Sequence, residues 1–317
     1  MSSHGQKTDG LQPVYSTVAP VHTTRAMIDA QLEEIDREER VEKDNSKLKG
    51  VNSKITTVDM ESIKEFDITS MERNSVILVV ASRRSGKTHI TQHILEQYHK
   101  KKPFDAVFLF SKTNSGFEKS IPQTYRFKTL DMLQNIVDTQ IKVKKHNKKA
   151  KKKDMVTSNI AIVLDDYVGS GGLTAEMRKN PILNKLAVNG RHLDFGGRSN
   201  VMVFMLSQIY TGISPQIRLN ADYVFTTKLS AKKERENIIQ GFLSLESGRQ
   251  GLANSYGVFD NIVNEKDFQF IVINTTAQNK TKFSDYTFKL VAPPKLEDIR
   301  LVGDSDDWKH NNLDIYF

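Results

Sequence analysis

Three consecutive residues, Gly86, Lys87 and Thr88, have the types that a protein needs to hold a polyphosphate. They follow an apolar run, residues 76–80, through the short segment Ala-Ser-Arg-Arg-Ser. Glycine lets the backbone approach a phosphate without a Cβ in the way, and backbone N–H groups at the start of a helix attract anions. Lysine neutralises the β- and γ-phosphates, and the threonine hydroxyl can ligate Mg²⁺. The order of buried strand, turn and helix therefore predicts a phosphate-binding loop.

This P-loop departs from the general pattern at one position, because Ala81 stands where a first glycine is usual. Downstream, apolar residues at 90, 94 and 95 recur at helical spacing, which predicts a helix that packs one face on a sheet. We expect the nucleotide to contact the loop and the first helical turn. These residues are Ser82, Arg83, Arg84, Ser85, Gly86, Lys87, Thr88 and His89.

A second apolar strand, residues 159–165, ends in the acidic pair Asp165 and Asp166. Such a strand delivers its last carboxylates to the edge of the sheet where the P-loop lies. We expect Asp165 to hold Mg²⁺ together with Thr88, and Asp166 to be the catalytic carboxylate that polarises the attacking water. A plain acidic turn at a strand end is the alternative, which the upstream P-loop disfavours.

Short apolar strands alternate with helical intervals between residues 70 and 230. This alternation predicts an α/β fold with a doubly wound, mainly parallel sheet that is covered on both faces. The expected strands are residues 76–81, 105–111, 159–165, 200–206 and 222–226, with further strand-like segments at 268–274 and 286–292. We interpret residues 105–111 as an additional strand between the strand of the P-loop and the strand of Asp165. In kinases and GTPases those two strands are direct neighbours.

The strand at residues 200–206 leads into the polar pair Ser207 and Gln208. In P-loop enzymes with an additional strand, a polar residue at this point faces the γ-phosphate and senses it. Gln208 has the correct position, and Ser207 is the alternative. Arg218 and Arg191 are candidates for an arginine finger, which stabilises charge on the transferring phosphoryl group. We favour Arg218, although either arginine can instead form an ordinary salt bridge.

Composition divides the 317-residue chain into three parts. Residues 1–70 predict a polar, partly helical or disordered N-terminal arm, residues 71–292 the P-loop domain, and residues 293–317 a peripheral tail. A lysine-rich insertion at about 142–153 carries much of the net charge of +8. Its self-repulsion predicts an unpacked, solvated segment, and contact with the phosphates of a nucleic acid is the alternative function.

Cysteine is absent, which excludes disulfides, thiolate metal sites and cysteine nucleophiles. The sequence contains neither a signal-peptide pattern nor an apolar run of the roughly 20 residues that span a bilayer. We therefore expect an intracellular protein without a transmembrane segment.

Several short motifs together resemble those of the genome-packaging ATPases of large double-stranded DNA viruses, the poxvirus-type members of the FtsK–HerA superfamily. The resemblance covers about residues 70–230. The motifs are Arg83-Arg-Ser-Gly-Lys-Thr88, Ile162-Val-Leu-Asp-Asp166, Gly190-Arg-His192, Leu206-Ser-Gln208 and Pro215-Gln-Ile-Arg-Leu-Asn220. Asp166 stands where many members of the superfamily carry glutamate. The fold that the resemblance implies is a P-loop NTPase of the additional-strand, RecA- and FtsK-like type.

The resemblance also implies an activity, namely ATP hydrolysis that drives viral double-stranded DNA into a capsid through a homo-oligomeric ring. It implies ATP and Mg²⁺ as cofactors, with Lys87, Asp166, Gln208 and Arg218 as catalytic residues and Arg218 acting in trans. It further implies a place in the host cytoplasm, at the viral factory, and in the virion, with capsid or membrane-associated virion proteins as partners. Two other functions stay open: a helicase-like P-loop ATPase that acts on nucleic acid, and a non-motor nucleotide-binding virion protein.

Overall fold

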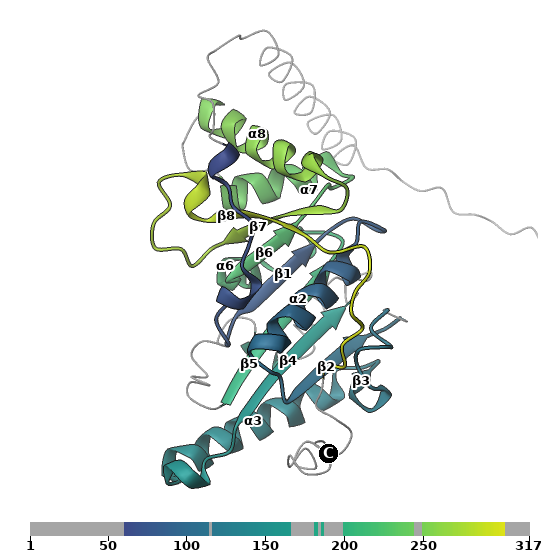
Figure 1. The fold of residues 1–317 in the computed structure, drawn as a ribbon, viewed down its shortest axis with the longest axis vertical. Coiled ribbons are helices and arrows are strands. Elements are labelled where there is room, and N and C mark those ends of the chain that lie inside the picture. Colours follow the sequence, from purple (N-terminus) through teal and green to yellow (C-terminus); the bar gives the residue numbers. More distant parts are fainter. Residues whose placement is uncertain are drawn as a thin grey trace, which may run out of the picture. The chain divides into compact units, whose positions relative to one another are not determined.

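A computed structural model describes residues 60–113, 116–165, 181–182, 185–186, 199–243 and 249–301 of the chain. These residues belong to one compact unit that spans residues 55–317. Their ribbon is drawn in Figure 1.

The described unit alternates strands and helices. The strands are β1 (Val76–Val80), β2 (Ala106–Ser111), β3 (Arg126–Phe127), β4 (Ser158–Asp165), β5 (Ser199–Ser207), β6 (Tyr223–Thr226), β7 (Gln269–Asn274) and β8 (Thr287–Val291). The helices are α2 (Lys87–Lys101), α3 (Asp131–Lys149), α6 (Pro215–Asn220), α7 (Lys232–Ile238), which a π-helical turn (Ile239–Leu243) continues, and α8 (Arg249–Glu265). Short 3₁₀ turns are η1 (Met60–Ser62), η2 (Ile68–Ser70), η3 (Gln123–Tyr125), η4 (Lys152–Asp154) and η6 (Phe283–Asp285). Each strand that the sequence predicted is confirmed to within one residue at either end, whereas β3, α6 and α8 were not predicted.

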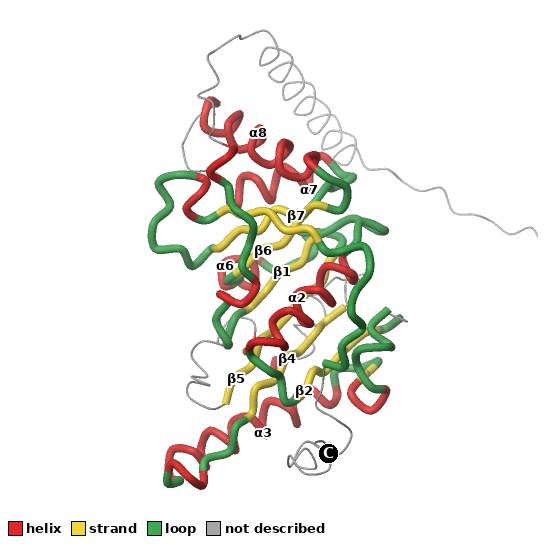
Figure 2. The backbone as a smooth tube through the Cα atoms, viewed as in Figure 1, coloured by secondary structure: helices red, strands yellow, loops and turns green. Residues whose placement is uncertain are grey.

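The described strands form one eight-stranded sheet in the order β3–β2–β4–β5–β1–β6–β7–β8. Figure 2 draws the strands in yellow. From β3 through β6 all neighbouring strands are parallel, and β7 and β8 then add antiparallel pairs. An antiparallel pair such as β7 and β8 needs no helical crossover, and the two are joined by a loop with one 3₁₀ turn. The prediction of a mainly parallel, doubly wound α/β sheet is confirmed.

The identity of the interposed strand differs from the prediction. β5 pairs with β1 on one side and with β4 on the other, whereas β2 pairs with β4 on its outer side. The expectation that residues 105–111 separate the P-loop strand from the Asp165 strand is therefore wrong. The order of strands along a chain does not determine their order in the sheet, because the helical crossover after β1 passes over two positions that later strands fill.

Most of the sheet is buried on both faces, whereas β3 and much of β8 are half-buried. Every residue of β1 and of β2 is buried, which explains why these strands are continuous apolar runs and do not alternate. The connections from β1 to β2 and from β2 to β4 run in opposite directions along the sheet. Because parallel crossovers are right-handed, α2 and α3 cover opposite faces. α2 packs on β1 through Ile90, Ile94 and Leu95, which are almost fully buried.

Residues that the sequence placed in the arm and in the tail also pack on this domain. Phe66 is buried, its backbone N–H donates to the carbonyl of Lys289, and its ring lies 5.6 Å from that of Phe225. The expected boundary at residue 70 therefore falls inside packed structure. At the other end, Leu301 is fully buried and its N–H donates to the carbonyl of Ser120.

The lysine-rich insertion is largely helical, contrary to the expectation of an unpacked segment. Its first part forms the last two turns of α3, with Val143 buried, and η4 follows. Asn147 stabilises the return of the chain, because its side chain donates to the carbonyl of Val156 at 2.7 Å and accepts from the N–H of Val156 at 2.8 Å. Self-repulsion is tolerated here because every lysine of the insertion except Lys144 is exposed to solvent, where salt screens the charges.

None of the described helices combines the length and the apolar character that crossing a bilayer requires.

Candidate nucleotide-binding site

The P-loop joins the end of β1 to the start of α2. Two of its residues have left-handed backbones, Arg84 with φ 62° and Gly86 with φ 87°. A non-glycine residue in this region is uncommon and marks a conformation that the surrounding structure imposes. The side chain of Ser85 closes the turn by donating to the carbonyl of Ser82 at 2.6 Å. Ala81 is fully buried and is not left-handed, so its backbone does not need the glycine that is usual there.

Gly86 is the N-cap of α2, and its carbonyl accepts the first helical hydrogen bond, from Ile90. The N–H groups of the first turn therefore point out of the helix toward the loop, where the positive end of the helix dipole favours an anion. A Cβ at position 86 would lie 3.3 Å from Cδ1 of Phe268. Both the backbone angle and this close approach explain why glycine stands here.

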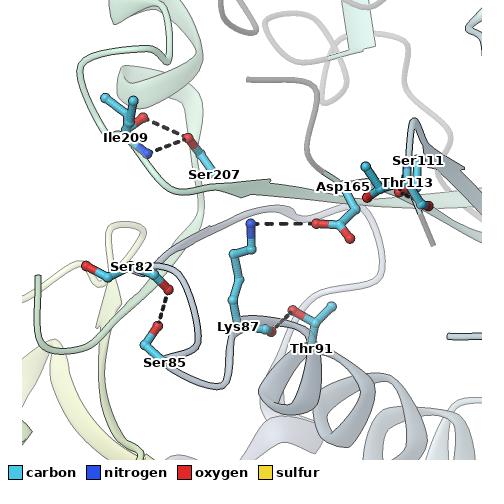
Figure 3. Close-up of polar contacts among 9 residues, drawn as sticks. All are labelled: Ser82, Ser85, Lys87, Thr91, Ser111, Thr113, Asp165, Ser207 and Ile209. Atoms are coloured by element: carbon cyan, nitrogen blue, oxygen red, sulfur yellow. Dashed lines mark hydrogen bonds and ion pairs between the residues drawn. The ribbon is translucent and has the colours of Figure 1, made fainter. Parts of the chain in front are cut away.

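Lys87 and Asp165 face one another across the site (Figure 3). Lys87 Nζ lies 3.7 Å from Asp165 Oδ1, and the two side chains are only 10% and 6% exposed. The register of the sheet brings them together, because Val80 is opposite Ser207, and Asp165 is opposite Leu206. The carboxyl ends of β1, β5 and β4 thus meet at one edge, as parallel strands require.

A cavity of about 820 Å³ opens at this edge. Its polar part includes P-loop residues and Asp165. Its apolar part comes from residues beside β7 and β8, the two antiparallel strands on the other side of β1 from β5 and β4. The lining residues are Ser82, Arg83, Arg84, Gly86, Lys87, Thr88, His89, Thr113, Asp165, Gln208, Asp267, Phe268, Val291, Ala292 and Pro294. Seven of the eight predicted nucleotide contacts are in this set, and Ser85 is the exception. The five lining residues from position 267 onward were not predicted, because no local motif marks them.

The end of β5 distinguishes between the two sensor candidates. The hydroxyl of Ser207 donates to the carbonyl of Ile209 at 2.7 Å and accepts from its N–H at 3.1 Å, so it serves the local turn (Figure 3). Gln208 lines the cavity. We call residues 208–213 the sensor loop. The carboxylate of Glu234, on α7, accepts hydrogen bonds from the N–H groups of Tyr210 and Thr211 and so anchors this loop.

Arg218 lies on α6 and packs on its own chain. Its guanidinium carbon is 4.5 Å from the centre of the Tyr210 ring, which is a cation–π contact. Burial raises the pKa of Tyr210, and the charge of Arg218 acts in the opposite direction. Within the described part of the chain, Arg218 does not line the cavity. Asp166, Arg191 and His192 lie outside the described residues, so their predicted roles stay predictions.

The donor set at this edge fits Mg²⁺. Asp165 supplies carboxylate oxygens and Thr88 a hydroxyl, and both line the cavity. Mg²⁺ prefers oxygen ligands and is commonly held by one or two carboxylates plus the phosphates of a substrate, not by a cage of protein groups. Among the described residues no cluster of three or more histidine, cysteine or acidic side chains can hold a metal.

These features define a class of protein. The P-loop follows β1, a carboxylate ends β4, and β5, whose end carries the cavity residue Gln208, lies between them. The chain therefore has the P-loop NTPase fold of the additional-strand type.

Comparison with known proteins gives one curated relative and several similar structures, while no family model matches. The relative is the uncharacterized protein L437 of Acanthamoeba polyphaga mimivirus, which is 20% identical over 186 residues. The match spans 58% of this chain and 62% of the mimivirus protein.

Among solved structures, the genome-packaging NTPase B204 of Sulfolobus turreted icosahedral virus 2, in complex with AMP, is 12% identical with a TM-score of 0.45. The comparison covers 71% of this chain and 100% of B204. The conjugation coupling protein TcpA of pCW3, with ATPγS, is 15% identical with a TM-score of 0.45, over 71% of this chain and 61% of TcpA. At these values the fold assignment rests on the strand order and the P-loop described above.

Proposed function

We propose that this protein is an Mg²⁺-dependent ATPase that moves double-stranded DNA through a homo-oligomeric ring, and that the DNA is a viral genome entering a capsid. The observation that supports this proposal most directly is the convergence on one cavity of Lys87, from the start of α2, with Asp165 and Gln208, from the ends of the adjacent strands β4 and β5. Such a convergence places a lysine, a carboxylate and an amide around one polyphosphate.

Each side chain then has a distinct role. Lys87 leaves Asp165 and binds the β- and γ-phosphate oxygens, while Asp165 and Thr88 hold the metal ion. Mg²⁺, when bound, neutralises charge that develops on the transferring phosphoryl group. Asp166 orients the attacking water. Gln208 contacts the γ-phosphate and loses that contact after hydrolysis.

The contacts around the cavity suggest how this loss becomes motion. The sensor loop is held by Glu234 of α7. The P-loop is tied to the residues just before the same helix, because Ser82 Oγ accepts from the N–H of Ser230 at 2.9 Å. A shift of Gln208 therefore acts on α7 through Glu234. At the same time, the hydrogen bond between Ser82 and Ser230 holds the start of α7 to the P-loop. α7 is the element that we expect to move between nucleotide states.

Arg218 does not line the cavity of its own chain, but in a ring it can act on the nucleotide of the neighbouring subunit. In a ring, each subunit presents the same surface to the next, so a residue outside its own site can complete the neighbouring one. Leu219, the next residue on α6, is 85% exposed, so this part of α6 is accessible to a neighbouring subunit. We propose that Arg218 is the finger and that it acts in trans.

The lysine-rich insertion is the proposed DNA contact. Its exposed lysines are Lys142, Lys145, Lys148, Lys149, Lys151, Lys152 and Lys153. They precede the first residue of β4, whereas the cavity lies at the end of β4, roughly 25 Å away for a strand of this length. The insertion therefore cannot touch the nucleotide, and its charge is available to DNA phosphates.

The proposed setting follows from the resemblance of the motifs to packaging ATPases. We propose that the protein works inside the host cell, at the viral factory, and that capsid or membrane-associated virion proteins receive the ring. The mimivirus relative supports a viral context.

Steady-state ATP hydrolysis, measured with and without long double-stranded DNA over a series of protein concentrations, tests the motor. We expect stimulation by DNA that rises cooperatively with protein concentration, and we expect Lys87→Ala to abolish it. Hydrolysis that ignores both DNA and concentration refutes the ring motor. A Lys87→Ala variant that hydrolyses ATP like the wild type refutes the site itself.

Mixed subunits test the finger. Lys87→Ala subunits keep Arg218, and Arg218→Ala subunits keep an intact P-loop. If Arg218 acts in trans, mixing the two inactive variants restores part of the activity, because some interfaces then combine a working P-loop with a working arginine. Arg218→Ala subunits that hydrolyse ATP normally by themselves contradict this role.

Salt dependence tests the DNA contact. We expect Lys→Gln at positions 148, 149, 151, 152 and 153 to weaken DNA binding and to reduce the slope of log K against log salt by about 0.9 for each lost phosphate contact. Lys266→Gln, an exposed lysine elsewhere, is the control. An unchanged slope would mean that the lysines of the insertion contact only solvent and not DNA.

A further inference from the structure

We propose that Phe268 is the platform on which the base of the nucleotide stacks, and that this apolar end of the cavity selects purine nucleotides. This inference rests on the proposed binding of a nucleotide in the same cavity. It adds a base subsite to a site that the sequence marks only at its phosphate end.

Phe268 is unusual in two independent respects. Its side chain is 61% exposed, although it is a large apolar residue. Its backbone is left-handed, with φ 55°, which is a genuine outlier for a bulky residue. Strained residues that persist at the rim of a cavity commonly serve a ligand. Neither feature helps the core, because the exposed ring is left largely to water.

The ring has the correct position relative to the phosphates. Its Cδ1 atom lies 3.3 Å from the point that a Cβ on Gly86 would occupy, so it packs directly against the phosphate-binding loop. A nucleotide whose phosphates lie on that loop must direct its ribose and base away from Lys87 and Asp165. Phe268 lines the cavity directly before β7, which lies on the other side of β1 from β5 and β4.

The other wall of this subsite is apolar and anchored. Val291, Ala292 and Pro294 line the cavity where β8 ends. The carbonyl of Pro293 lies 2.7 Å from Nε2 of His89, in the first turn of α2, which fixes this wall relative to the P-loop. A planar base has two apolar faces, and a ring on one side with an aliphatic wall on the other removes both from water.

Other exposed apolar residues do not offer the same arrangement. Ile209 and Leu219 are also exposed, but within the described residues neither lines the cavity. Phe268 is thus the large exposed apolar side chain that a bound nucleotide can reach.

Stacking on an aromatic ring depends on the area of the base more than on its hydrogen-bonding groups. We therefore expect ATP and GTP to bind with similar affinity and CTP and UTP to bind more weakly. Phe268 acts on binding and positioning, so its loss should raise KM for ATP and leave kcat nearly unchanged.

The test compares ATP with inorganic tripolyphosphate, which has the phosphates but no base, by calorimetric titration of the full chain. We expect Phe268→Ala to weaken ATP about tenfold and to leave the affinity for tripolyphosphate unchanged. Phe268→Trp should retain ATP binding, and its indole fluorescence should be quenched by ATP but not by tripolyphosphate. Phe283→Ala, which removes a partly exposed ring that does not line the cavity, is the matched control.

The outcomes separate this inference from the proposed function. If Lys87→Ala abolishes binding of both ligands but Phe268→Ala changes neither, the phosphate site stands and the base subsite is refuted. If Phe268→Ala weakens both ligands equally, the residue shapes the P-loop and does not stack. If the wild type binds neither ligand, the proposed function fails as well. Thermal unfolding of Phe268→Ala confirms that the variant is folded, as an exposed residue should allow.

Discussion

Replacing Asp165 by asparagine should have opposite effects on ATP binding with and without Mg²⁺. Without metal, the carboxylate holds Lys87 at 3.7 Å and competes with the phosphates for its charge. With metal, the same carboxylate is a ligand that the nucleotide complex needs. The substitution keeps the shape of the side chain and removes only the charge.

The geometry gives the size of the effect. At 3.7 Å and an effective dielectric constant of about 20, the attraction between the two charges is roughly 4.5 kcal/mol. Most of this is offset, because both groups are nearly buried and lost hydration on folding. A net change of about 1–2 kcal/mol remains, so Asp165→Asn should tighten Mg²⁺-free ATP by roughly 5- to 30-fold. The apparent affinity for Mg²⁺ should fall by roughly tenfold or more.

Displacement of a fluorescent ATP analogue, in EDTA and in excess Mg²⁺, measures both effects. Asp105→Asn is the matched control. Asp105 lies just before β2, at the amino ends of the parallel strands and therefore away from the cavity, and its carboxylate accepts a hydrogen bond from the N–H of Asn159. Equal weakening in EDTA and in Mg²⁺ would mean that Asp165 only supports the local fold. That result would refute both the competition with phosphate and the metal role.

Three further predictions concern the elements around the site. Gly86→Ala should lower the free energy of unfolding in denaturant by about 1–2 kcal/mol, because the backbone of Gly86 has a φ of 87°. Ala81→Gly should be tolerated by the P-loop and should not weaken ATP binding. Glu234→Ala should release the sensor loop, so that kcat falls while KM for ATP changes little; an unchanged kcat contradicts the coupling through α7. Burial lowers the pKa of His99 below its ordinary value of 6.5, and its Nδ1 accepts from the N–H of Phe104. The unfolded chain then binds the proton more tightly, so the free energy of unfolding should rise with pH up to about 6.5, and His99→Gln should flatten that rise.

The sequence determined the phosphate end of the site because its parts are contiguous. A strand, a turn and a helix that follow one another bring Gly86, Lys87 and Thr88 together by local geometry alone. The end of a buried strand likewise identifies Asp165, since parallel strands share one carboxyl edge. These inferences need no knowledge of which strands are neighbours.

Only the tertiary structure decided the strand order, the state of the lysine-rich insertion and the base end of the cavity. β5 lies between β1 and β4 because crossovers leave gaps that later strands fill, and chain order does not record this. The end of α3 is ordered by the hydrogen bonds of Asn147 to Val156, which composition does not reveal. Phe268 and Gly86 are far apart in the sequence and meet because β7, which follows Phe268, pairs with β6. Local chemistry can be predicted from contiguous residues, whereas contacts between distant segments depend on how the whole chain packs.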